Sequence, residues 1–251
     1  MSEIDLDEIE RIFDESWDEL INEFEDGKWI PMIEKDLQLY LAHKLINRLS
    51  EMGKTDWVRI EFPVPLDPSR LKKDLLIHGR IIQRRVRKTD IAIVDIDEIP
   101  PRIYLIAEVK CFIPKFGPVS PGRAGVKWIE YLKTADREAV EAVRSELYMS
   151  EHNYIRDADR VFITPILNDL DRVSSLINRY EEAGIKILGY VCVFDLIYGE
   201  GPIWDKILSK YSEDKYPGVI LRSFGYNSYE VIKVVVEDCL KRKQRKGRKQ
   251  K

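Results

Sequence analysis

Three ionisable side chains stand out because each borders a largely apolar stretch of the chain. Asp90 comes directly before the run 91–96, which is apolar apart from Asp95, and Glu108-Val109-Lys110 ends the next apolar run. Side chains alternate along a strand, so Glu108 and Lys110 share one face while Val109 points into the other. A carboxylate and an ammonium at the end of a core strand are costly unless something there uses them. The pattern therefore predicts a site for a divalent cation, with Asp90 contributing from the neighbouring strand.

Two strands joined by a short turn are needed to position these residues. The first is expected over 91–96, opening with Asp90, and the second over 103–109, with Pro100 and Pro101 in the turn between them. The second run is almost continuously apolar, which is typical of a strand buried on both faces. Both strands are therefore expected in the core.

This arrangement, an acid at a strand start followed by Glu-x-Lys on the next strand, resembles the PD-(D/E)XK nuclease superfamily. Here it reads Thr89-Asp90 and Glu108-Val109-Lys110, with Thr89 in place of the usual Pro. The resemblance covers about residues 30–197 and implies a restriction-endonuclease-like αβββαβ core. It also implies Mg²⁺- or Mn²⁺-dependent hydrolysis of DNA that leaves a 5′-phosphate.

The resemblance also implies roles for single residues. Asp90, Glu108 and the carbonyl group of Val109 are expected to bind the metal ion. Lys110 is expected to orient or deprotonate the attacking water and to stabilise the charge that develops on the phosphate. Glu34, on the preceding helix, is expected to complete the metal ligands or to hold a second ion through water. The alternative for Glu34 is a flanking residue of that helix.

Basic residues gather beside Asp90. Residues 70–88 contain eight Lys and Arg and a single acidic residue. Such a run neutralises DNA phosphates, or forms a solvated hairpin that pairs with the acidic N-terminal segment. The Pro- and Gly-rich segment 113–125 is either an active-site rim or a plain connector. The residues expected to contact nucleic acid are Arg84, Arg85, Arg87, Lys88, Lys115, Arg123 and Lys127.

Composition argues against several other functions. Three scattered cysteines form no CxxC or Cys/His cluster, which argues against disulfides, structural zinc and an iron–sulfur cluster. No GxxxxGK[ST], GxGxxG or GxSxG motif occurs. The N-terminus is acidic and no run reaches membrane-spanning length, so we expect a cytoplasmic, nucleoid-associated protein without a membrane partner. Abundant Lys, Glu, Arg and Ile with few Gln is typical of a thermophile.

The overall pattern predicts an α/β fold with a mixed sheet flanked by helices. Further helices are expected over 31–52, 126–149, 169–183, 204–211 and 229–240, and further strands over 57–62, 160–167 and 185–197. The predicted division is an acidic amphipathic helical segment 1–30, a nuclease-like core 31–200, a helical C-terminal addition 201–240 and a basic disordered tail 241–251. The tail is expected to bind polyanions loosely or only to aid solubility.

Residues 1–30 hold twelve acidic residues against two basic ones, and their apolar residues recur at helical spacing. The favoured interpretation is a helix packed on the core with a solvated acidic face. The alternatives are a subunit contact, which would give a homodimer, and an acidic flap that competes with nucleic acid.

Taken together, the residues predict a metal-dependent DNA endonuclease in restriction, repair or recombination. One alternative is a non-catalytic nucleic-acid-binding or assembly subunit that keeps the nuclease fold. Another is a structural ion pair between Glu108 and Lys110 in an unrelated α/β protein.

Overall fold

The computed structural model describes residues 4–26, 28–29, 31, 33–68, 86–98, 101–112, 159–195, 202–212 and 214–225. The helices are α1 (Leu6–Glu25), α2 (Glu34–Glu51), the π-helical turn η3 (Asp159–Ile163), α7 (Thr164–Glu182) and α8 (Pro202–Leu208). The strands are β1 (Val58–Pro65), β2 (Val86–Asp95), β3 (Arg102–Phe112), β4 (Leu188–Asp195) and β5 (Val219–Gly225). The segments predicted over 113–125, 126–149, 229–240 and 241–251 lie outside the described residues.

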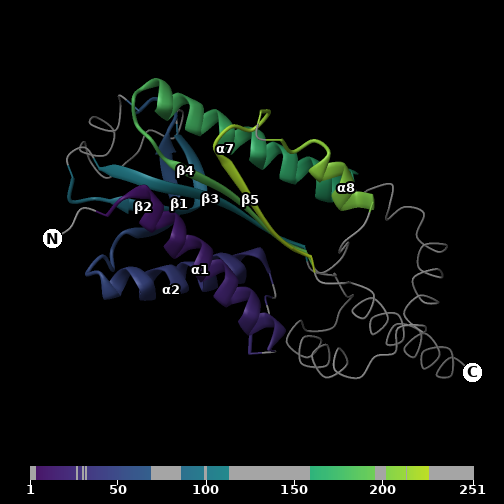
Figure 1. The fold of residues 1–251 in the computed structure, drawn as a ribbon, viewed down its shortest axis with the longest axis horizontal. Helices are drawn as coiled ribbons and strands as arrows, with labels where there is room; N and C mark the ends of the chain where they lie inside the picture. The colour runs from purple at the N-terminus through teal and green to yellow at the C-terminus, as the bar shows by residue number, and fades with distance from the viewer. Residues whose placement is uncertain are drawn as a thin grey trace, which may run out of the picture.

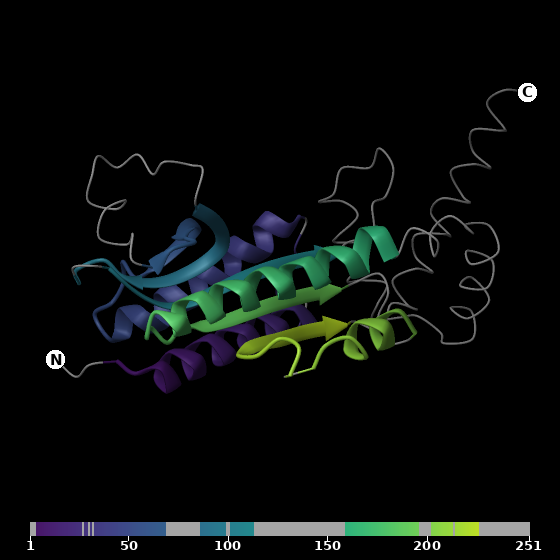
Figure 2. The same cartoon turned by 90° about the horizontal axis from the view of Figure 1, so that it is seen from above.

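The strands form one mixed sheet in the order β1-β2-β3-β4-β5. The first three are antiparallel neighbours, whereas β3, β4 and β5 run parallel. Helices α1 and α2 cover one face, and α7 and α8 cover the other (Figure 1). Viewed from above, α7 lies along β4 (Figure 2). The predicted α/β fold with a mixed, helix-flanked sheet is therefore confirmed.

Local sequence explains where the helices begin and end. The carboxylate of Asp5 accepts a hydrogen bond from the Glu8 amide at 2.8 Å and caps the start of α1. Gly53 and Gly184 follow α2 and α7 with φ of +72° and +77°. This left-handed conformation ends a helix at little cost only for glycine.

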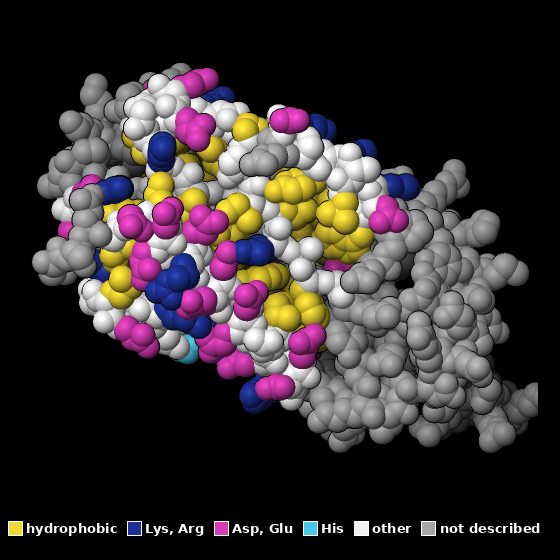
Figure 3. Space-filling model, in the orientation of Figure 1, with side chains coloured by type: hydrophobic (Ala, Val, Ile, Leu, Met, Phe, Trp, Pro, Cys, Tyr) yellow, Lys and Arg dark blue, Asp and Glu magenta, His cyan; other side chains and the backbone are white. Residues whose placement is uncertain are grey.

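Helix α1 packs on the core, as the favoured interpretation predicted, although part of its acidic face pairs with α2 and is not simply solvated. Its buried residues recur at helical spacing and are Ile9, Ile12, Phe13, Ser16, Trp17, Leu20 and Phe24. Its acidic face meets α2, where the Lys44 ammonium lies 2.8 Å from Glu19 and 2.7 Å from Glu23. Acidic side chains with Lys and Arg among them gather on this side of the molecule (Figure 3). The apolar face of α1 is thus buried within its own chain.

The contact between α1 and α2 predicts a loss of stability in acid. Hydrogen bonds from Lys44 hold the pKa of Glu19 and Glu23 below the usual 4.5. A lowered folded-state pKa stabilises the fold above pH 4.5, and this contribution is lost as pH falls through the folded value. We expect the melting temperature to fall less steeply below pH 4.5 in Lys44→Met than in the wild type. Lys186→Met, at an exposed position, is the control and should keep the wild-type slope.

Strands β1, β2 and β3 run beyond their predicted bounds because their neighbours extend them. Strand β1, predicted over 57–62, continues through Pro63 and Pro65; it pairs only with β2 among the described strands, and an edge strand tolerates Pro. Strand β2 begins at Val86, so Asp90 lies inside it and not at its start. Strand β3 runs on to Phe112, so Glu108-Val109-Lys110 does not end it. Pairing with β4 carries β3 past the motif.

Residues 160–167 were predicted to form a strand, and this was wrong. They form η3 and the first turn of α7, where Pro165 occupies a first-turn position that tolerates it. A short apolar run fits a buried strand and a buried helix equally well, so periodicity could not separate the two. Strand β5 was not predicted, although α8 beside it was.

A close approach between α7 and β4 gives a second stability prediction. A Cβ atom added to Gly189 would lie 2.4 Å from Ile177 Cδ1 and 2.5 Å from Val173 Cγ1. We expect Gly189→Ala to lower the free energy of unfolding by about 1–3 kcal/mol, because the added methyl overpacks the interface. Urea denaturation measures the change. Adding Ile177→Val removes one clashing atom and should recover part of the loss, whereas unchanged stability in the single variant would contradict the packing.

Candidate active site

The predicted residues meet at a fork in the sheet. Strand β2 pairs with β3 as far as Ile91 and Ala107. Beyond that pair β2 continues alongside β1, and β3 continues alongside β4. Asp90 and Glu108 stand one residue beyond the last pair, on opposite arms of the fork. A fork leaves backbone groups without a partner strand, so side chains must satisfy them.

Two side chains of β2 close the fork. Asp90 Oδ2 accepts a hydrogen bond from the Val109 amide at 2.8 Å. Thr89 Oγ1 is buried and donates to the carbonyl oxygen of Ala107 at 2.9 Å. These bonds hold the Asp90 carboxylate against the backbone between Glu108 and Lys110. The predicted proximity of Asp90 to the Glu-x-Lys tripeptide is therefore present.

Glu108 and Lys110 point to the α7 side of the sheet, where they meet two residues of that helix. Glu108 is 2% exposed and forms an ion pair with Arg172. Lys110 Nζ lies 3.2 Å from Asp169 Oδ2, and Arg172 Nη2 lies 2.8 Å from Asp169 Oδ1. An i, i+3 pair on α7 thus contacts both charged residues of the tripeptide.

Glu34 reaches the same place from the other face of the sheet. It is the first residue of α2, and its Oε1 lies 3.5 Å from Lys110 Nζ. Its carboxylate also accepts from the backbone amide of Cys111. Leu37, one turn into α2, is fully buried, whereas Ile33, which precedes the helix, is 57% exposed. Glu34 nevertheless lies beside the motif, as predicted.

These contacts define a group that we call the fork cluster: Glu34, Asp90, Glu108, Lys110, Asp169 and Arg172. Burial raises the pKa of Glu108 to about 9; the guanidinium of Arg172 opposes this shift and the charge of Asp90 adds to it. Burial also raises the pKa of Glu34 and of Asp169, against the influence of Lys110. The cluster therefore holds more carboxyl groups than its own cations can keep ionised.

Lys110 carries its proton firmly in this arrangement. Burial acts to lower its pKa, but the negative charges of Asp169, Glu34 and Asp90 outweigh burial and the net shift is upward. Lys110 Nζ also donates to the Val109 carbonyl oxygen at 3.3 Å. In this state Lys110 is suited to stabilise negative charge and not to abstract a proton.

The chemistry of the fork cluster fits a hard divalent cation. Its four carboxyl groups face two cationic side chains, so full ionisation would leave two negative charges, the charge that one Mg²⁺ neutralises. Carboxylate and carbonyl oxygens are the ligands that Mg²⁺ and Mn²⁺ prefer. Within the described ranges, however, no three His, Cys, Asp or Glu side chains are arranged to hold an ion. Arg172 and Lys110 lie among the carboxylates instead.

The residues predicted to contact nucleic acid are described only in part. Arg87 and Lys88 lie on β2, three and two residues before Asp90, and are exposed. Lys88 Nζ lies 3.5 Å from Glu61, whose φ of +52° is unusual for a residue other than glycine. The remaining predicted contacts, Arg84, Arg85, Lys115, Arg123 and Lys127, lie outside the described residues.

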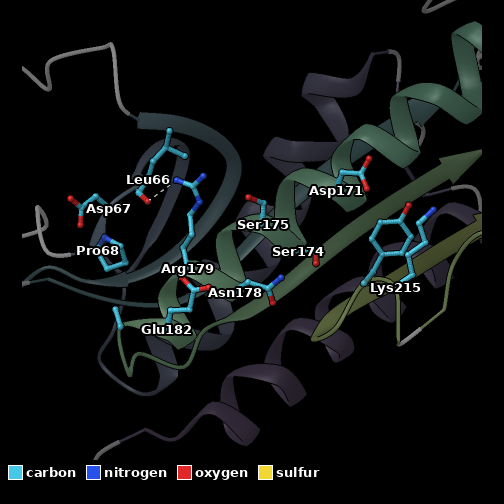
Figure 4. Close-up of a pocket in the computed structure, with 12 residues that line it drawn as sticks. Leu66, Asp67, Pro68, Asp171, Ser174, Ser175, Asn178, Arg179, Glu182 and Lys215 are labelled. Atoms are coloured by element: carbon cyan, nitrogen blue, oxygen red, sulfur yellow. Dashed lines mark hydrogen bonds between the residues drawn. The ribbon is translucent and has the colours of Figure 1, made fainter.

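Two adjoining hollows follow the outer surface of α7. One, of about 650 Å³, is lined by Arg87 and Lys88 of β2 and by Asn168, Asp169, Asp171, Arg172 and Ser175 of α7, so it borders the fork cluster. The second, of about 840 Å³, shares Asp171 and Ser175 with it and extends towards the end of α7 (Figure 4). There Arg179 Nη1 donates to the carbonyl oxygen of Leu66 at 3.3 Å.

Sequence reasoning missed Asp169 and Arg172. The sequence placed both in the helix predicted over 169–183, but their spacing marks only a helical pair. The one available signal was Asp169 among the apolar positions Ile166, Leu170 and Val173, all of which the structure buries. Their contact with residue 108 depends on how α7 packs across β3.

Comparisons with known proteins found no relative: no protein-family model, curated protein or solved structure matches the chain. In the described parts of the chain, no helix combines the length and the apolar character needed to cross a membrane.

Proposed function

We propose that the protein is a metal-dependent DNA endonuclease of the PD-(D/E)XK type, acting in restriction, repair or recombination. The observation that supports this most is the fork, where the Asp90 carboxylate binds the Val109 amide between Glu108 and Lys110. The described elements α2, β1, β2, β3, α7 and β4 also follow one another in the order that the resemblance implies.

In this proposal the metal site is built from oxygen atoms around the fork. Asp90, Glu108 and the Val109 carbonyl would hold Mg²⁺ or Mn²⁺, with Glu34 completing the ligands. When bound, the ion lowers the pKa of a water and neutralises charge on the phosphate. The Val109 amide orients Asp90, because its hydrogen bond fixes one carboxylate oxygen at the fork.

Lys110 has an electrostatic role in this scheme. Its ammonium sits between Glu34 and Asp169, at 3.5 and 3.2 Å, and its raised pKa keeps it charged. A fixed cation beside the scissile phosphate stabilises the charge that develops during hydrolysis. Of the two roles predicted for Lys110, charge stabilisation is the one that its surroundings favour.

One observation favours the alternative, a non-catalytic nucleic-acid-binding or assembly subunit. Arg172 forms an ion pair with Glu108, and a guanidinium there satisfies the carboxylate without a metal ion. In such a subunit the fork cluster would be purely structural. An assay for DNA cleavage distinguishes the endonuclease from the non-catalytic subunit.

The decisive experiment is incubation with supercoiled, linear, single-stranded and branched DNA, and with RNA, in the presence of Mg²⁺ or Mn²⁺. We expect internal cleavage of DNA with either ion and none after chelation with EDTA. Restoring Mg²⁺ should restore cleavage. Binding without cleavage on every substrate would favour the non-catalytic subunit, and cutting that survives chelation would exclude the metal-dependent mechanism.

A further inference from the structure

Arg172 is placed where a metal ion and a phosphate would both compete with its present contacts. A single atom of its guanidinium, Nη2, contacts both Glu108 and Asp169. Its Nε atom is buried and has no hydrogen-bond partner among the described residues. The Nε atom therefore takes no part in the two-nitrogen contact that gives Arg–carboxylate pairs their strength. The guanidinium contacts two carboxyl groups while its Nε donor stays unused.

The same side chain lines the hollow beside the fork cluster. Arg87 and Lys88 stand across from it on β2, and Asn168 and Ser175 flank it on α7 with neutral polar groups. Asp169 is already paired with Arg172 and Lys110, so Asp171 is the remaining acidic residue of the lining. Three cations and two neutral hydrogen-bonding groups around one hollow suit a backbone phosphate.

We propose that Arg172 couples metal binding to nucleic-acid binding. In the free protein its guanidinium contacts the Glu108 carboxyl group; a phosphate in the hollow draws the guanidinium away, and that carboxyl group becomes available to the divalent cation. This inference rests on the proposed function and adds its regulation. Because coupling between two ligands is reciprocal, the metal ion must strengthen nucleic-acid binding by the same factor.

The first test is calorimetric titration of Mn²⁺ into the DNA-free protein. Removing the competing guanidinium in Arg172→Met should strengthen Mn²⁺ binding by about tenfold, within the range of such couplings. Arg179→Met is the matched control: it lies two turns further along α7, and its guanidinium binds a backbone carbonyl group. It should keep the wild-type affinity. Unchanged or weaker Mn²⁺ binding in Arg172→Met would overturn the inference.

The second test needs only the wild type and therefore stands even if Arg172→Met does not fold. A short DNA duplex with phosphorothioate linkages keeps its negative charge and resists hydrolysis. We expect it to raise the Mn²⁺ affinity of the wild type by about fivefold or more, and of Arg172→Met hardly at all. Equal wild-type affinities with and without the duplex would overturn the coupling.

The two proposals fail in different ways. If the wild type cleaves DNA with Mg²⁺ but shows no coupling, the inference on Arg172 is wrong and the endonuclease stands. If the wild type neither cleaves DNA nor binds Mn²⁺, both are wrong.

Discussion

Asp90→Asn, Glu108→Gln and Lys110→Met are each expected to slow DNA cleavage by about 10²–10⁴-fold, the usual cost of losing one charged catalytic group. The first two keep a hydrogen-bond acceptor, so the Val109 amide and Arg172 retain their partners while the metal site loses charge. DNA affinity measured in the absence of a divalent cation should change little, because none of the three is expected to make the main contacts to the phosphates. Single-turnover cleavage and filter binding measure the two quantities separately.

Glu181→Gln is the control for these variants. It removes a carboxylate from the exposed side of α7 at a position that lines neither hollow and lies outside the fork cluster. Its cleavage rate should stay close to that of the wild type. Wild-type rates in all three fork variants would remove these residues from the active site, and a parallel loss in Glu181→Gln would point to a general charge effect.

Phe13→Ala is expected to lower the free energy of unfolding by about 3–5 kcal/mol, the usual cost of truncating a buried aromatic residue. The Phe13 ring is fully buried, and its centroid lies 4.1 Å from that of Tyr190 on β4. Truncation leaves a cavity between α1 and the sheet. Denaturant unfolding followed by circular dichroism measures the loss.

Leu39→Ala is the matched control, because Leu39 is a large apolar residue on a helix but is 49% exposed. We expect it to change stability by less than about 0.5 kcal/mol. Equal, small effects of both substitutions would mean that α1 is a detachable flap. That outcome would revive the idea of an N-terminal segment that competes with nucleic acid.

The contact between α1 and the sheet also bears on a homodimer. Asp14 of α1 accepts hydrogen bonds from the Tyr190 hydroxyl group at 3.1 Å and from Arg222 Nε at 3.0 Å, so polar groups as well as apolar ones join α1 to β4 and β5. The apolar face of α1, the candidate surface for a subunit contact, therefore packs against the sheet of its own chain. A dimer through another surface stays a prediction.

The presence of α1 and the approximate extent of α2 were predictable from the sequence because the signals are local. Apolar residues repeat at the helical period in both segments, and the helix expected over 31–52 is observed over Glu34–Glu51. The shared face of Glu108 and Lys110 was predictable for a similar reason: alternation along one strand places both side chains on that face whatever surrounds them. The turn between β2 and β3 is short enough to bring Asp90 beside them.

Where each strand begins and ends was less predictable, because pairing with neighbouring strands determines these bounds. Pro63 and Pro65 argue for a strand end, yet they lie in β1, which pairs with β2 on one side only among the described strands. β5 alternates only weakly, and it forms because β4 offers backbone partners along its length. The apolar run at 160–167 fits both a strand and a helix until its packing is known.

The sequence by itself determined which residues could do chemistry: a carboxylate, a second carboxylate and a lysine at strand spacing, with Glu34 on a helix before them. The tertiary structure alone decided what surrounds them. Asp169 and Arg172 lie about sixty residues further along the chain than Glu108, and only the packing of α7 across β3 brings them into contact. Secondary structure depends mainly on residues that are neighbours in the sequence, whereas the charge balance of a buried site depends on every segment that packs against it.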